Sequence, residues 1–336
     1  MNLIEYKTTD ELTKQEKQYL GILGTTMILA IFYFVGVTKT MSLEKLSMFL
    51  NNSDERLASQ MTSNRHLESM FEELNLRASS VLVFDVFRNE VIYQKNENQK
   101  MPLASLTKVM TAVVAMEALK NTEVINIPKE ALDQTGDNGL FADEKWGRDD
   151  LLKFMLITSS NDAAKAVAMT AGKILPNDAE NPRKDIENFV YYMNQKSKEL
   201  GFLDTYFFNE SGLDVTGDEN GGYGTAKEMS QLFTYATEKY PEIFNSTSYD
   251  TKTFTSLNQL PHVAHNTNQS VGKVAGISAS KTGFTNISGG NLIVSFEAGL
   301  HHPIVLVVLG STFDERFTDI TQLSTATIKA INTLDS

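Results

Sequence analysis

The stretch LASLTKVMTAVVAMEAL, residues 103–119, is the segment on which the interpretation of this 336-residue chain depends. Its apolar residues recur at helical spacing, so we expect a helix from about Ser105 to Lys120. Ser105 and Lys108 lie three residues apart and therefore on one face of that helix. A serine hydroxyl becomes a nucleophile when a base takes its proton, and a desolvated lysine can be that base. Taken alone, the pattern is more typical of an N-capping serine ahead of an ordinary helical lysine.

A second polar motif interrupts another apolar run. The segment LLKFMLITSSNDAAKAVA, residues 151–168, has helical spacing on both sides of Ser159-Ser160-Asn161. Serine and asparagine compete with a helix for hydrogen bonds to the local backbone. The helix therefore either ends here or breaks so that a hydroxyl and an amide face a cleft.

The third motif is Lys281-Thr282-Gly283, which we expect at the end of a strand. A lysine and a hydroxyl at such a position can hold a carboxylate, and a glycine lets a ligand backbone approach closely. An exposed strand end without a ligand is the plainer interpretation of these three residues alone.

The hydrophobic pattern along the rest of the chain predicts an α/β (α+β) domain. We expect strands over 79–86, 90–96, 277–282, 290–298 and 302–311, and helices over 148–173 (broken at the SSND tetrad), 185–200, 226–239 and 313–334. Because the strands form hairpins near both ends of the domain, the economical assembly is one antiparallel sheet with helices on its faces. Residues 121–150 are rich in Asn, Asp and Gly and are expected to be mostly loop.

The N-terminal part differs from a soluble domain. Residues 18–38 contain 21 residues without a charge, which as a helix would span roughly 31 Å. A buried core helix would carry a polar stripe and a signal peptide an A-x-A-like site, so we expect a retained membrane anchor with a cytoplasmic N-terminus. The predicted organisation is a cytoplasmic tail (1–17), a transmembrane helix (18–38), a helical stalk (39–77) whose second part docks on the following domain, and a globular domain (78–336).

Charge and cysteine content exclude several classes of function. The chain has 42 acidic and 30 basic residues, a net charge of −12, and no cysteine. The acidic balance argues against nucleic-acid binding, which needs a basic face, and thiol catalysis, disulfides and zinc–thiolate sites are excluded. His262 and His265 lie three residues apart without a glutamate partner in the sequence, so we expect no metal site.

The three motifs together carry more information than each alone, because S-x-x-K, S-x-N and K-T-G in this order are the set of the penicillin-binding proteins and related β-lactamases. With FNESGLD (208–214), YGTAKEMSQL (223–232) and NTNQ (266–269), the chain from about 78 to 315 resembles the serine-type D-alanyl-D-alanine carboxypeptidase family, the low-molecular-mass penicillin-binding proteins. The resemblance implies a DD-peptidase/β-lactamase-like fold, with an antiparallel sheet flanked by helices and a helical subdomain.

The resemblance also implies catalytic roles. Ser105 would form an acyl-enzyme with the penultimate D-Ala of a peptidoglycan stem peptide, Lys108 would be the general base, and Ser159 would relay a proton to the leaving amine. β-Lactams would acylate the same serine. No metal or cofactor is implied, and the catalytic domain would lie outside the cytoplasm at a bacterial cell membrane.

Substrate-binding roles follow from the same resemblance. Asn161 would hold the acyl-side amide, Lys281 and Thr282 the terminal carboxylate, and Gly283 would leave room for the substrate strand. The backbone N–H groups of the nucleophile and of Phe284 would form the oxyanion hole.

Two other functions remain open at this point. A class A-like β-lactamase needs a glutamate after the S-x-N motif, and Glu210 falls there without the expected pattern, while Glu72-Glu73-Leu74-Asn75 precedes the nucleophile. The second alternative is a non-catalytic domain that binds peptidoglycan or β-lactams as a sensor. Endopeptidase action on cross-linked peptides is also open.

Overall fold

The computed structural model describes residues 70–136 and 139–334. The predicted tail (1–17), the predicted span (18–38) and most of the predicted stalk (39–77) lie outside these residues. Within the described part of the chain, no helix is both long enough and apolar enough to cross a membrane.

Hairpins from both ends of the domain meet in one antiparallel sheet of five strands, in the order β10-β11-β12-β1-β2. The strands are β1 (Ser80–Asp85), β2 (Glu90–Lys95), β10 (Ile277–Thr285), β11 (Gly289–Glu297) and β12 (Pro303–Ser311). This confirms the predicted sheet, and the register joins β1 to β12 from Ser80 opposite Leu309 to Asp85 opposite Ile304. Strand β10 lies at one edge of the sheet, and only one of its sides pairs with another strand of that sheet.

Both faces of the sheet are buried, which explains the continuous apolar sequence of β12. Side chains alternate between the faces of a strand. One set packs in a core with helix α9 (Glu315–Leu334): Ile304, Leu306 and Val308. The other set packs in the core formed with the remaining helices: Val305, Val307 and Leu309.

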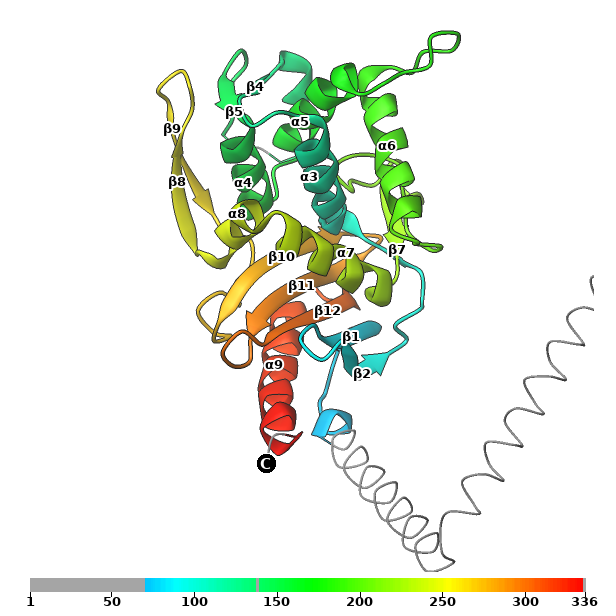
Figure 1. Cartoon of the computed structure of the whole chain (residues 1–336), viewed down its shortest axis with the longest axis vertical. Helices are drawn as coiled ribbons and strands as arrows, with labels where there is room; N and C mark the ends of the chain where they lie inside the picture. The colour runs from blue at the N-terminus through cyan, green and yellow to red at the C-terminus, as the bar shows by residue number, and fades with distance from the viewer. Residues whose placement is uncertain (1–69, 137–138, 335–336) are drawn as a thin grey trace, which may run out of the picture. The chain divides into compact units, whose positions relative to one another are not determined.

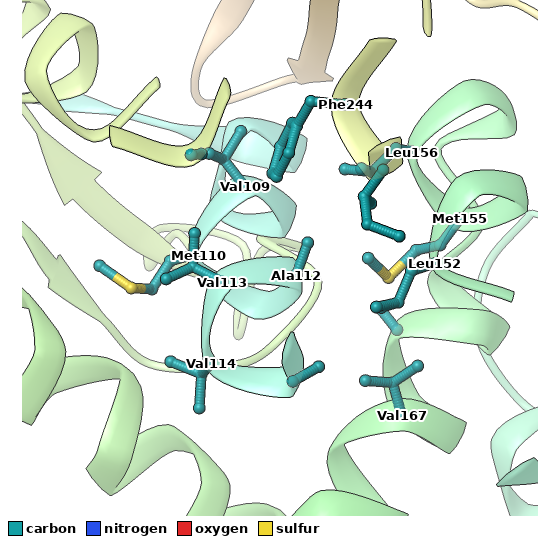
Figure 2. Close-up of a cluster of buried hydrophobic side chains, with 14 of the residues drawn as sticks. Val109, Met110, Ala112, Val113, Val114, Leu152, Met155, Leu156, Val167 and Phe244 are labelled. Atoms are coloured by element: carbon teal, nitrogen blue, oxygen red, sulfur yellow. The ribbon is translucent and has the colours of Figure 1, made fainter. Parts of the chain in front are cut away.

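The other helices form the second core. They are α3 (Thr107–Ala118), α4 (Arg148–Thr158), α5 (Asn161–Ile174), α6 (Asp185–Glu199), α7 (Ala226–Lys239) and α8 (Pro241–Phe244). Helices α3 to α7 confirm the helical predictions to within a few residues, whereas the short α8 was not predicted. Helix α7 contacts β1 and β12, while α9 contacts β11 and β12 on the opposite face. Figure 2 shows Ala112 of α3 on the side of the helix that faces Met155 of α4 and Val167 of α5.

Several short elements were not predicted. Strands β4 (Val124–Asn126) and β5 (Lys145–Gly147) pair within the segment expected to be mostly loop, and β8 (Thr251–Thr255) pairs with β9 (Pro261–His265) as a separate hairpin. Strands β3 (Met101–Pro102), β6 (Tyr206–Phe207) and β7 (Gly222–Gly224) form a small sheet in the order β3-β7-β6. These strands have two to five residues and few apolar positions, so their periodicity is too weak to detect.

The start of the described chain packs onto the sheet. The backbone is helical at residues 70–72, and Phe71 is buried and stacks on Tyr93 of β2 with ring centroids 4.8 Å apart. Residues 70–72 therefore pack on the domain, and that they end a stalk stays a prediction.

Candidate active site

Ser105 lies in a one-turn 3₁₀ helix, η1 (Ala104–Leu106), that leads directly into α3. Its neighbour Ala104 has a positive φ of 47°, which is unusual for a residue with a side chain. The N-cap residue of α3 is Leu106, which makes no side-chain capping bond. The interpretation of Ser105 as an N-capping serine is therefore wrong. Its hydroxyl oxygen instead lies 2.9 Å from the Nζ of Lys108, one helical turn along the chain.

Lys108 is fully buried, and burial lowers the pKa of its amine from 10.5 to about 7, although the negative charge of Glu210 opposes the shift. The Nζ donates to the Oδ1 of Asn161 and to the carbonyl oxygen of Ser211, each at 2.7 Å. A neutral amine has two N–H groups and one lone pair. Because two acceptors take the two N–H groups, the lone pair is left for the hydroxyl of Ser105.

The carbonyl of Ser211 reaches Lys108 because the loop that carries it packs tightly against η1. Gly212 has a φ of +81°, and a Cβ there would lie 1.9 Å from the carbonyl oxygen of Ala104. The Oδ1 of Asn209 accepts from the backbone N–H of Gly212 at 2.7 Å, which closes the turn. Glycine is therefore required at this close approach.

The Ser159-Ser160-Asn161 motif joins α4 to α5. Ser159 ends α4 with a left-handed φ of 62°, and the Oγ of Ser160 caps α5 by accepting from the backbone N–H of Ala163. This break turns the side chain of Asn161 toward Lys108. Its Nδ2 donates to the carbonyl oxygen of Thr135 at 2.8 Å, so both ends of the amide are occupied.

The third motif lies on the edge strand β10. The Nζ of Lys281 is 2.8 Å from the Oγ of Ser159, and the Oγ1 of Thr282 contacts the Oγ1 of Thr267. The expectation that this motif ends a strand is wrong, because β10 continues to Thr285 through pairing with β11. The pKa of Lys281 is well below its usual value, mainly because the amine is buried and also because the charges of Lys108 and Arg316 are near.

Gly283 brings β10 against the nucleophile. A Cβ at this position would lie 2.8 Å from the carbonyl oxygen of Leu103 and 3.2 Å from the backbone nitrogen of Ser105. The strand and η1 can approach this closely only because residue 283 has no side chain. The side chain of the next residue, Phe284, is partly exposed and packs edge-on against Phe313.

Two charged residues of the site were not assigned from the sequence. Arg316 on α9 is buried and donates from Nη1 to the carbonyl oxygen of Gly283 at 2.8 Å, and burial lowers the pKa of its guanidinium to about 10. Glu210 is also buried, and burial raises the pKa of its carboxyl while Lys108 and Lys165 oppose the shift. No sequence pattern distinguishes Arg316. Glu210 lies in the FNESGLD segment, but its burial near Lys108 depends on the tertiary fold.

The histidines lie away from this cluster, and one expectation about them is wrong. His262 on β9 does have a glutamate partner, since its Nε2 lies 2.5 Å from the Oε1 of Glu144, and both side chains are buried. Among the described residues, no group of three or more His, Asp or Glu side chains is arranged to hold a metal ion.

Comparisons with known proteins agree with the motifs. The sequence model of a family described as D-alanyl-D-alanine carboxypeptidase, Peptidase S11, matches residues 68–312. D-alanyl-D-alanine carboxypeptidase DacF of Bacillus subtilis is 30% identical over 257 residues, which cover 75% of this chain and 62% of that protein. A D-alanyl-D-alanine endopeptidase of Pseudomonas aeruginosa is also 30% identical, over 70% of this chain and 71% of that protein.

Solved structures show the same fold. Penicillin-binding protein D2 of Listeria monocytogenes, in a cefotaxime-bound form, matches with a TM-score of 0.63 and 29% identity, covering 76% of this chain and 98% of that chain. A mutant of the Streptomyces K15 DD-transpeptidase matches with a TM-score of 0.67 at 20% identity over 76% of this chain and 98% of that chain, a likeness that concerns the fold alone.

Proposed function

The chain belongs to the D-alanyl-D-alanine carboxypeptidase family, Peptidase S11, and we propose on that basis that it removes the terminal D-Ala from peptidoglycan stem peptides. The reaction would run through an acyl-enzyme on Ser105, and β-lactams would acylate the same residue. The observation that carries this proposal is the 2.9 Å contact between Ser105 Oγ and Lys108 Nζ, with the other two directions of the amine occupied by acceptors.

The acylation step follows from that contact. Lys108, with a pKa of about 7, takes the proton of Ser105 as the Oγ attacks the carbonyl carbon of the penultimate D-Ala. The bond to the terminal D-Ala then breaks, and the leaving nitrogen receives a proton through the hydroxyl of Ser159. Support for that relay comes from the Lys281 Nζ, which lies 2.8 Å from the Ser159 Oγ. Water hydrolyses the ester and returns the site to its starting state.

Positive charge at the site favours a substrate that ends in a carboxylate. Lys281 and Thr282 would bind this carboxylate, with Arg316 adding charge from α9. Its negative charge would favour the protonated form of Lys281, whose pKa burial has lowered. The backbone N–H groups of Ser105 and Phe284 would hold the oxyanion.

Asn161 has a second role in this proposal besides holding the acyl-side amide of the substrate. In the structure its Oδ1 already accepts from Lys108 and its Nδ2 donates to Thr135. The side chain therefore orients the base, and it can meet the substrate amide only by exchanging one of these bonds.

The test is product analysis by mass spectrometry. The full chain is incubated with a pentapeptide ending in D-Ala-D-Ala and, separately, with a cross-linked muropeptide dimer, because relatives are named both carboxypeptidases and endopeptidases. We expect release of D-Ala from the pentapeptide, and no release or penicillin labelling with Ser105→Ala. The matched control is Ser248→Ala, a half-exposed serine on η3 (Asn245–Ser248).

Other outcomes would overturn the proposal in distinct ways. Rapid turnover of penicillin without D-Ala release would identify a β-lactamase, and stable labelling without D-Ala release would identify a sensor. Cleavage of the dimer alone would identify an endopeptidase. Activity that survives in Ser105→Ala would remove the nucleophile from the proposal.

We also propose that residues 18–38 anchor the domain to the bacterial cell membrane, with residues 39–77 as a stalk and residues 78–336 as the catalytic domain outside the cytoplasm. Support comes from the 21 uncharged residues of the predicted span. The full chain should remain in the membrane fraction after alkaline carbonate washing, and a chain that starts at residue 39 should be released. Release of the full chain by carbonate alone would overturn this assignment.

A further inference from the structure

A groove of about 470 Å³ lies outside the reactive centre, between α6 and the strand β6. Its walls combine aromatic rings with long polar side chains. The helix contributes Val190, Tyr191, Asn194 and Lys198, and the strand side contributes Tyr206 and Phe208. Nothing in the proposed hydrolysis uses these residues.

The strand side presents two exposed aromatic rings. Side chains alternate along a strand, so the buried Phe207 separates Tyr206 and Phe208, which are 49% and 52% exposed. Their ring centroids lie 5.0 Å apart, and Phe208 also packs edge-on against Tyr223 of β7. Clustered rings of this kind, rather than single exposed ones, mark a binding surface.

The helix side adds positive charge. The guanidinium of Arg183 lies 3.8 Å from the ring centroid of Tyr191, and Lys198 is exposed at the other end of the groove lining. Glu187 is the acidic residue of the lining. The lining therefore has two basic residues, Arg183 and Lys198, and one acidic residue, whereas the whole chain has a net charge of −12. This local positive charge favours a ligand that carries a carboxylate.

A sugar ring fits the aromatic side of the groove, formed by Tyr206 and Phe208. The C–H groups on one face of a pyranose ring carry slight positive charge and pack against the negative face of an aromatic ring, as other apolar groups with polarised hydrogens do. Hydroxyls at the sugar edge can reach polar side chains around the rings, in the usual arrangement of a ligand pocket. A carboxylate of the attached peptide, close to the sugar, would meet Arg183 and Lys198.

The groove is tied to the nucleophile through the sheet β3-β7-β6. The backbone N–H of Leu103, two residues before Ser105, donates to the carbonyl oxygen of Gly222 on β7, and β7 pairs with β6. Three residues after Phe208, the carbonyl of Ser211 accepts from Lys108. A ligand held on β6 is therefore held on the same small framework that orients the nucleophile and its base.

We propose that this groove is a saccharide subsite that binds the glycan portion of an acidic glycopeptide whose peptide end is presented to Ser105. The inference rests on the proposed function, because it identifies the glycan that the peptide substrate is attached to. It predicts that the protein prefers a peptide joined to its disaccharide over the free peptide.

The test uses the full chain carrying Ser105→Ala, so that the probes are not consumed. The two probes are N-acetylglucosaminyl-N-acetylmuramyl-pentapeptide and the same pentapeptide without sugars, and the dissociation constants are measured by calorimetry. We expect the disaccharide to add about tenfold in affinity, as two aromatic contacts of ordinary strength would. Adding Tyr206→Ser and Phe208→Ser together should remove that difference, and Arg183→Gln should weaken the binding of both probes.

The matched control is Tyr249→Ser, which removes an equally exposed aromatic ring before β8 and should keep the tenfold difference. Thermal unfolding of each variant shows that the fold is intact. Equal affinity for the two probes, or a difference that survives the double variant, overturns the saccharide subsite. Failure of the unsubstituted chain to react with penicillin and release D-Ala overturns the proposed function instead, and the two failures are distinguishable.

Discussion

The rate of acylation of Ser105 should depend on pH through Lys108. Burial lowers the pKa of this lysine from 10.5 to about 7, a preference for the neutral amine of about 5 kcal/mol. Only the neutral amine can take the serine proton. The rate constant for acylation should therefore rise about tenfold per pH unit from pH 5, reach half its maximum near pH 7, and level off by about pH 8.

The assay is single-turnover labelling with a fluorescent penicillin at saturating concentration. A penicillin is suitable because its carboxylate stays ionised between pH 5 and 8, so the pH dependence of the rate comes from the protein. A control for acid unfolding is available in the chain itself. Trp146 is the sole tryptophan in the sequence and is buried in the helical core, so its fluorescence reports loss of the fold at each pH.

Two results would refute the reasoning. A labelling rate that does not change between pH 5 and 8 would mean that no group of this pKa controls the reaction. A midpoint above pH 9 would mean that Lys108 keeps nearly its usual pKa, so that the contacts with Asn161 and Ser211 do not hold a neutral amine.

Three further substitutions test other parts of the structure. Glu210→Gln removes a buried negative charge that favours protonated Lys108, so the midpoint of the pH–rate profile should move below that of the unsubstituted chain; no movement contradicts the electrostatic link. Gly283→Ala places a Cβ 2.8 Å from a backbone oxygen beside Ser105 and should slow penicillin labelling at least tenfold, and an unchanged rate would show that β10 can move aside. Asp319→Ala removes the carboxylate that accepts from two backbone N–H groups and one hydroxyl, and should lower the free energy of unfolding in urea by about 3 kcal/mol; a change below about 1 kcal/mol contradicts that role.

The parts of the fold with strong local patterns were predictable. The hairpins that form the five-stranded sheet and the helices α3 to α7 have long apolar periodicity, and their positions followed from the sequence. The hairpin β8-β9 did not, because its burial depends on partners elsewhere: Phe254 and Ala264 pack into the core, and His262 contacts Glu144, 118 residues away.

The site divides in the same way. The approach of Ser105 to Lys108 is a consequence of helical spacing and could be predicted from four residues. The contact between Ser159 and Lys281 spans 122 residues and was accessible only through the order of the motifs in a known family. The backbone acceptor at Ser211 was not accessible at all, because every residue has a carbonyl group and only the fold decides where it points.

The two buried lysines give the site a cost to stability that its ligand can offset in part. For Lys108 and Lys281 the folded chain holds a proton less readily than the unfolded chain does, because their pKa values are lowered on folding. Between about pH 7 and 10.5 the unfolded state therefore binds more protons, and stability rises with pH across this window. A bound carboxylate favours the protonated form of Lys281 and thereby offsets the loss of stability that the burial of this lysine causes. The hydrogen bonds of Lys108 go to Ser105, Asn161 and Ser211, outside the proposed carboxylate site, so these contacts, and not burial, distinguish the lysine that reacts from the lysine that binds.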